Sequence, residues 1–123
     1  MKNTKLGTIE SKFADMIWNN EPISTASLVK LCEKELDWKR TTTYTVLKRL
    51  SERGLFQNEN GTVTSLVSRN DFYSMKTESF VNETFGGSLP AFLASFTSRK
   101  KLSKEEIAEI RRLIDNYGEE TER

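Results

Sequence analysis

Apolar residues recur with helical spacing between residues 41 and 54. They form one face that consists of Thr43, Val46, Leu47 and Leu50. A period between three and four residues is that of one face of an α-helix, so the pattern predicts a helix here. We expect Thr41 to cap its start and Gly54 to end it, because glycine adopts the left-handed conformation of a helix C-terminus without strain. The opposite face is polar and consists of Thr42, Thr45, Lys48, Arg49 and Glu52.

The same periodicity predicts five further helices. The first begins at Thr8 and ends before Pro22, because proline disfavours helical geometry at the residue before it. The other four are expected to follow N-capping serines, which are Ser24, Ser68, Ser88 and Ser103. The last three of these are expected to end near Gly86-Gly87, Ser98 and Gly118. Cys32 lies on the apolar stripe of the second helix, which is typical of a small buried core residue rather than a reactive thiol.

Between residues 55 and 67 the pattern changes from helix to strand. Asn60-Gly61 is the strongest short hairpin signal, because a type I′ turn requires positive φ at both of its central residues. The residues that follow, Thr62, Val63 and Thr64, favour a strand. Three helices and then a hairpin is the order of a winged helix-turn-helix, so we expect a mainly α fold with a small β-hairpin wing.

Three predicted helices with apolar stripes follow the hairpin. We expect residues 1–70 to form a winged-helix DNA-binding domain and residues 71–123 to form a helical dimerisation domain. A chain of 123 residues offers only a modest core to a lone monomer, and burial shared with a second subunit would relieve that shortage. The alternative is that these stripes pack back onto the N-terminal domain of the same chain.

The chain is almost neutral, with a net charge of +1, but its charge is unevenly distributed. Residues 38–54 contain five Lys and Arg against one Glu, so this segment carries +4. A concentrated positive charge is what contact with DNA phosphates requires. Two alternatives remain: a solvated face that serves solubility, and a winged-helix module that binds protein and never contacts DNA.

Histidine is absent and Cys32 is the only cysteine in the sequence. The chain therefore lacks the commonest general base and metal ligand, and it cannot form an internal disulfide. No nucleophile–base pair, phosphate loop or paired-carboxylate site can be assembled, so we expect neither an enzyme nor a cofactor or metal site. The sequence has no signal peptide and no long apolar run, which predicts a cytoplasmic protein without membrane insertion.

Several motifs along the chain occur in a specific order and spacing. Around the predicted recognition helix they are Trp38, Thr42-Thr43, Leu47, Arg49-Leu50 and Gly54-Leu55. Elsewhere they are Glu10, Met16-Ile17-Trp18, the segment 85–89 and the segment 102–107. In these motifs the sequence resembles, over nearly its whole length, the BlaI/MecI/CopY family of bacterial repressors, the penicillinase and methicillin-resistance repressors in particular.

The resemblance implies a homodimer that binds an inverted-repeat operator in double-stranded DNA and blocks transcription. By position, the base-approaching face consists of Thr41, Thr42, Tyr44 and Thr45, and the backbone-contacting flank consists of Lys48 and Arg49. The cations Lys39 and Arg40 are also expected to meet phosphates. Trp38 either anchors the helix in the core or stacks on the sugar-phosphate backbone, and we favour the anchor because a buried tryptophan usually packs.

In the antibiotic-sensing branch of the family, the resemblance implies release by a membrane metalloprotease sensor that cuts within the dimerisation region. The matching bond here is Ser95–Phe96, where relatives carry Asn before the Phe. Alternatively, Phe96 is a core residue of the dimer interface, a role that needs no protease. The copper-sensing branch carries a cysteine-rich C-terminal motif, which this sequence lacks, so copper sensing by that chemistry is not expected.

Overall fold

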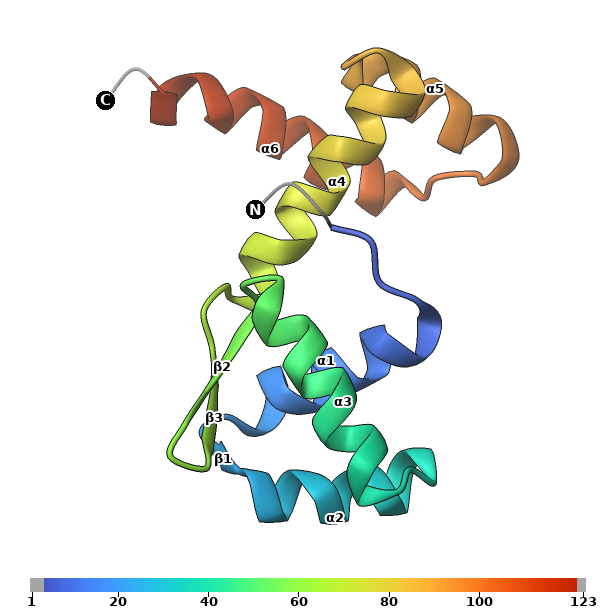
Figure 1. Cartoon of the computed structure of the whole chain (residues 1–123). Coiled ribbons are helices and arrows are strands. Elements are labelled where there is room, and N and C mark those ends of the chain that lie inside the picture. Colours follow the sequence, from blue (N-terminus) through green and yellow to red (C-terminus); the bar gives the residue numbers. More distant parts are fainter. Residues whose placement is uncertain (1–3, 122–123) are drawn as a thin grey trace. The chain divides into compact units, whose positions relative to one another are not determined.

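The computed structural model describes residues 4–121 (Figure 1). The elements in chain order are α1 (Thr8–Asn20), β1 (Ile23–Ser24), α2 (Thr25–Leu36), α3 (Arg40–Glu52), β2 (Phe56–Glu59), β3 (Thr62–Ser65), α4 (Arg69–Phe85), α5 (Leu89–Arg99) and α6 (Lys104–Thr121). The chain divides into two compact units, Met1–Phe80 and Val81–Arg123, and the division falls within α4. The functional boundary expected between residues 70 and 71 stays a prediction.

The first unit is held by a core that its helices share with the sheet. The fully buried side chains include Phe13, Ile17, Leu28, Leu50, Phe56, Val63 and Phe72. The predicted apolar face of α3 is the buried one, because Thr43, Val46, Leu47 and Leu50 all lie inside. Cys32 is buried as expected. The register of α3 on this core decides which of its side chains remain exposed.

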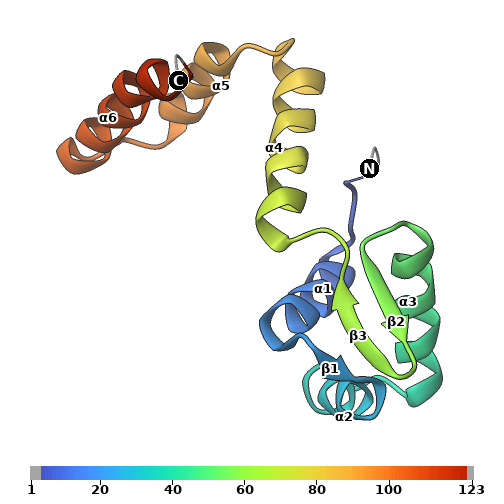
Figure 2. The same cartoon turned by 90° about the vertical axis from the view of Figure 1, so that its left-hand side faces the viewer.

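The hairpin belongs to an antiparallel sheet in which β3 lies between β1 and β2 (Figure 2). Asn60 and Gly61 have φ values of 51° and 85°, so both central residues of the turn are left-handed, as predicted. The prediction of a mainly α protein with a winged helix is confirmed. Strand β1 was not predicted: it has two residues, and its partners in β3 are Val63 and Thr62, about forty residues later in the chain.

The C-terminal end of α1 fixes the base of the wing. The Trp18 indole Nε1 donates a hydrogen bond of 3.0 Å to the Val67 carbonyl, and its ring packs against Phe56 and Phe72. The Glu21 carboxylate accepts hydrogen bonds of 2.8 Å from the backbone N–H and the hydroxyl of Ser65. A single helix end therefore positions the end of β3 and the start of α4.

Most predicted helix ends are confirmed. Each predicted capping serine accepts a hydrogen bond from the backbone N–H three residues later, in the first turn of its helix. These serines are Ser24, Ser68, Ser88 and Ser103. Gly54 follows α3 with a φ of 82°, as expected. Two expectations are wrong. Residue 41 does not cap α3, since the N-cap is Lys39, and α6 does not end at Gly118, which continues the helix to Thr121 because it does not adopt the left-handed conformation.

The second unit has a small interior. Helix α5 buries none of its residues, and its contacts with the end of α4 include an edge-on contact of 5.7 Å between the Phe85 and Phe92 rings. Large apolar side chains on the surface of this unit are Leu89, Phe96, Ile107, Leu113, Ile114 and Tyr117. Leu113 is 71% exposed and Tyr117 is 66% exposed. Among residues 4–121, no helix is both long enough and apolar enough to cross a membrane.

Candidate nucleic-acid interface

The exposed face of α3 carries most of the side chains that the sequence assigned to DNA. Packing of the apolar face leaves hydroxyls and cations in solvent: Lys39, Arg40, Thr41, Thr42, Thr45, Lys48 and Arg49 are exposed, and Tyr44 is half-buried. An α-helix fits the major groove of B-DNA, where short hydroxyl side chains reach base edges and cations reach phosphates. The structure therefore brings all eight predicted DNA-contacting residues onto one helix and its N-cap (Figure 1).

The turn before α3 determines where this face begins. Asp37 ends α2 with a left-handed φ of 54°, and the Trp38 N–H donates a hydrogen bond of 3.3 Å to the Cys32 carbonyl. Lys39 is then extended and precedes the first helical residue, Arg40. Thr41 thus lies in the first turn with its hydroxyl unused as a cap, which leaves that hydroxyl available to a ligand.

Trp38 lies against the protein rather than out in solvent. It is half-buried, and its ring centroid is 5.3 Å from that of Phe13 in α1. It also packs against the buried core. This geometry supports the anchor interpretation, in which Trp38 fixes the start of α3 relative to α1.

The Thr45 hydroxyl is oriented by the helix itself. It donates a hydrogen bond of 2.8 Å to the carbonyl of Thr41, one turn earlier. With its proton committed to that carbonyl, the outward hydroxyl oxygen is left as an acceptor, and its methyl group is left as an apolar contact. On a base edge, this arrangement suits an amino group or a thymine methyl.

Tyr44 connects α3 to the start of α2 and the wing turn. Its ring lies 5.5 Å below the Arg40 guanidinium, and a hydrogen bond with the Thr25 side chain lowers the pKa of its hydroxyl, with a smaller contribution from the Arg40 charge. The Thr25 N–H donates a hydrogen bond of 2.9 Å to the Gly61 carbonyl. Tyr44 therefore lies at the edge of the exposed face, where α2, α3 and the wing meet.

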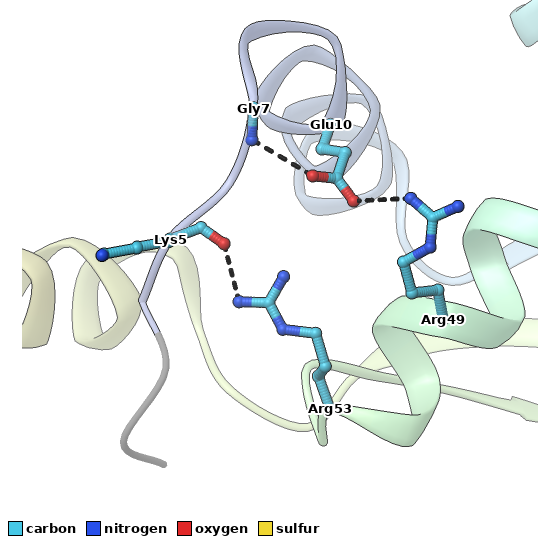
Figure 3. Close-up of polar contacts among 5 residues, drawn as sticks. All are labelled: Lys5, Gly7, Glu10, Arg49 and Arg53. Carbon is cyan, nitrogen blue, oxygen red and sulfur yellow. Dashed lines mark hydrogen bonds and ion pairs between the residues drawn. The ribbon is translucent and has the colours of Figure 1, made fainter.

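Arg49 makes an ion pair within the first unit. Its Nη1 lies 3.2 Å from Oε2 of Glu10 in α1, and its side chain is still 55% exposed (Figure 3). Oε1 of Glu10 accepts a hydrogen bond of 3.1 Å from the Gly7 N–H. That backbone bond is the largest of the effects that hold the pKa of Glu10 below its ordinary value. Burial, the second-largest effect, raises the pKa, and smaller contributions from the Arg49 hydrogen bond and from the charges of Arg49 and Arg53 lower it further.

Arg53 holds the segment before α1. Its Nη2 donates a hydrogen bond of 2.7 Å to the Lys5 carbonyl (Figure 3). The adjoining Thr4 is buried and Leu6 packs on the core. Arg49 and Arg53, one turn apart, therefore tie the C-terminal half of α3 to the chain segment around the start of α1.

The wing contributes backbone groups, neutral side chains and one carboxylate, but no cation. Residues 54–68 contain no Lys or Arg and one Glu. At the turn, the Asn58 side-chain oxygen accepts a hydrogen bond of 3.0 Å from the Gly61 N–H, and Asn58, Glu59 and Asn60 are exposed. Positive charge at this interface therefore comes from α3 and its flanks.

Sequence reasoning missed the polar partners of the face. It noted Glu10 only as part of a family motif, and it gave no role to Thr25 or to Arg53 beyond its charge. Glycine is an accepted N-cap residue, and a glutamate three residues later supplies the acceptor half of a capping box, so part of the cap of α1 was detectable. The pairing with Arg49 spans 39 residues and leaves no local signal.

The predicted cleavage bond, Ser95–Phe96, lies inside α5. Both residues are exposed, and the Phe96 ring centroid is 6.2 Å from that of Phe92. The Ser95 carbonyl accepts a hydrogen bond of 2.7 Å from the Ser98 hydroxyl. Within the described part of the chain, no group of three or more Cys, Asp or Glu side chains is placed to hold a metal ion.

Comparison with known proteins identifies relatives over nearly the whole chain. The family model described as penicillinase repressor matches residues 6–116. The chain is 28% identical over 120 residues to a penicillinase repressor of Bacillus licheniformis, covering 94% of each protein. It is 22% identical over 118 residues to the methicillin resistance regulatory protein MecI of Staphylococcus epidermidis, covering 93% of this chain and 96% of that protein.

The stability contributed by Glu10 should depend on pH. Because its pKa is lowered in the folded state, the ionised form stabilises the fold: the contribution is fully present above the ordinary value of 4.5 and is lost as pH falls through the folded-state pKa. We expect Glu10→Gln to lower the free energy of unfolding at pH 7 by up to about 1 kcal/mol, the upper end of the range for a partly exposed ion pair. Below the folded-state pKa the difference should vanish.

Urea unfolding followed by circular dichroism between pH 3 and pH 7 measures this difference. Glu33→Gln, at an exposed position of α2, is the matched control. A Glu10→Gln profile parallel to that of wild type at every pH would show that the ionised carboxylate does not contribute.

Proposed function

Because the chain belongs to the penicillinase repressor family, we propose that it represses transcription as a homodimer bound to dyad-symmetric operator DNA. The family consists of bacterial transcriptional repressors and not of enzymes. The observation that carries the proposal is the exposed face of α3, where hydroxyls and cations project from a helix whose other face is locked in the core. We place this activity in the cytoplasm, where the operator is.

The residues of this face have separate roles in the proposal. Phosphate contacts come from Lys39, Arg40, Lys48 and Arg49, and supply affinity for any duplex. Base contacts come from Thr41, Thr42 and Thr45 on the exposed face and from Tyr44 at its edge. Two observations support direct contact with base edges: the Thr45 hydroxyl oxygen is left as an acceptor, and the Thr41 hydroxyl does not cap the helix.

The surface of the second unit supports self-association. A groove of about 950 Å³ runs along α6, lined by Leu89, Leu113, Ile114 and Tyr117 together with polar residues. Exposed apolar surface of this kind is typical of an interface between subunits. A second copy would bury it, and a two-fold dimer would present two α3 helices to the two half-sites of the operator.

We propose that repression is relieved by proteolysis at Ser95–Phe96 by a membrane-bound sensor protease. The bond lies in a helix with no buried residues, so local unwinding, which a protease needs in order to bind an extended segment, costs little packing. Cleavage would separate α6 and its apolar face from the rest of the chain. The dimer interface would then be lost, and with it the paired presentation of α3.

Arg49→Ala should weaken binding to every duplex and flatten the plot of log affinity against log salt by about one unit for each bound subunit, because each subunit loses one phosphate contact. Fluorescence anisotropy with the duplex upstream of its own gene, at several salt concentrations, measures both quantities. Arg69→Ala is the matched control: the Arg69 side chain is 57% exposed and pairs at 3.0 Å with Asp15, so the pair joins α4 to α1 and does not involve α3. An unchanged slope for Arg49→Ala, or an equal change for both variants, would contradict the assignment.

Leu113→Asp should convert the protein from dimer to monomer, because it places a charge in the apolar face of α6. Sedimentation equilibrium at micromolar concentration should give twice the chain mass of 14.2 kDa for wild type and the chain mass itself for the variant. Leu66→Asp, at a leucine 54% exposed in the first unit, should remain a dimer. A monomeric wild type would refute the dimer proposal.

Incubation with the cognate sensor protease should give two fragments, residues 1–95 and 96–123, by mass spectrometry. Ser95→Asn, which restores the residue found in relatives, should be cut at least as fast. Ser98→Asn, at an exposed position three residues later in the same helix, should be cut like wild type. An intact chain, or fragments from another bond, would refute this release mechanism.

A further inference from the structure

The Arg49–Glu10 ion pair places an acidic group beside the cationic face of α3. Arg49 lies on the flank of that face nearest α1, and its guanidinium reaches back to the Glu10 carboxylate at 3.2 Å (Figure 3). Since the Arg49 side chain is 55% exposed, its remaining N–H groups are accessible to solvent. The group proposed to contact a phosphate is thus already bound to an anion of the same protein.

Glu10 is held in this position independently of Arg49. Its second oxygen accepts the Gly7 N–H at the start of α1, and its side chain is only 24% exposed. The carboxylate therefore remains beside α3 whether Arg49 is bound to it or not. A long surface side chain would move away from an approaching phosphate, whereas this one is fixed by the cap of a helix.

The pair is weak enough for DNA to compete with it. Partly exposed ion pairs contribute about 0–1 kcal/mol in water, whereas a duplex presents a dense row of phosphates. If Arg49 turns to a phosphate, it gives up its ion pair with Glu10, and that loss is subtracted from the binding free energy. If Arg49 stays with Glu10, one phosphate contact is lost. In both cases the carboxylate opposes binding, and it does so for every base sequence.

We propose that Glu10 attenuates DNA affinity by competing with the phosphate backbone for Arg49. This inference rests on the proposed function, because it concerns the same helix face. It assigns to the first helix a role in setting how tightly the protein holds any duplex, separate from the residues of α3 that select a sequence.

Glu10→Gln tests the inference, because the amide oxygen can still accept the Gly7 N–H while the charge is removed. We expect about three- to tenfold tighter binding at about 50 mM salt, to the duplex upstream of its own gene and to a scrambled duplex alike. The gain should shrink as salt rises to about 0.5 M, since salt screens the interactions of Arg49 with both the carboxylate and the phosphate. Anisotropy titrations with both duplexes measure it.

Asp15→Asn is the matched control. It makes the same change in net charge on the same helix, and it also breaks an ion pair, that of Asp15 with Arg69 at 3.0 Å. Its affinity should stay within about twofold of wild type, since the Asp15 pair does not involve α3. In an Arg49→Gln background, Glu10→Gln should lose most of its effect, because the group for which Glu10 competes is gone.

The outcomes separate this inference from the proposed function. If wild type binds DNA but Glu10→Gln binds no more tightly than Asp15→Asn, the inference is wrong and the repressor proposal stands. An undiminished gain in the Arg49→Gln background would assign the effect to charge alone and also overturn the competition. If wild type binds neither duplex at low salt, both proposals fail.

A measurement on the unaltered protein gives an independent check. The guanidinium NMR signals of Arg49 should shift when duplex is added, because Arg49 exchanges a carboxylate for a phosphate. Those of Arg69, in its pair with Asp15, should not. An Arg49 signal that stays fixed at saturating DNA in wild type and in Glu10→Gln alike would overturn the competition, because Arg49 would then contact no phosphate in either protein.

Discussion

The structure depends on the packing of one face of α3 against the core of the first unit. Thr43, Leu47 and Leu50 lie inside, and the side chains between them are forced outwards. Successive residues of a helix differ by about 100° in direction, so a slip of one residue would bury hydroxyls and expose leucines. Packing of one side of the helix on the core therefore determines which side chains are exposed on the other side. Trp38, packed on Phe13, fixes the point at which this register begins.

Much of the fold could be predicted from local sequence patterns. The periodicity of α3, the serine caps and the Asn60-Gly61 turn are each set by neighbours within four residues, so they could be predicted from the sequence. The start of α3 could not, because the left-handed Asp37 and the extended Lys39 place the first helical residue before Thr41. Strand β1 was missed for a related reason, since two residues carry no pattern and their partner strand lies far along the chain.

In the candidate site, too, the residues set by local periodicity could be predicted, whereas their long-range partners could not. The polar face read from the periodicity of α3, which consists of Thr42, Thr45, Lys48, Arg49 and Glu52, is exposed in the structure. Two side-chain contacts of α3 could not be predicted from the sequence, because the partners come from other elements. Glu10 pairs with Arg49 from α1, and Thr25 hydrogen-bonds to Tyr44 from the start of α2. These contacts decide which charges are already satisfied before any duplex arrives. A near-neutral chain can therefore have a cationic face in which one cation is already paired with a residue outside that face.

The hydrogen bond from the Thr25 N–H to the Gly61 carbonyl gives the wing an unexpected mechanical property. It closes the chain into a ring that contains α2, α3 and β2, with the hairpin tip fastened to the first residue of α2. The tip of the hairpin is therefore not free to move independently of α2. A force on the tip would be transmitted to α2 directly, so the hairpin and the two helices should move as one rigid body.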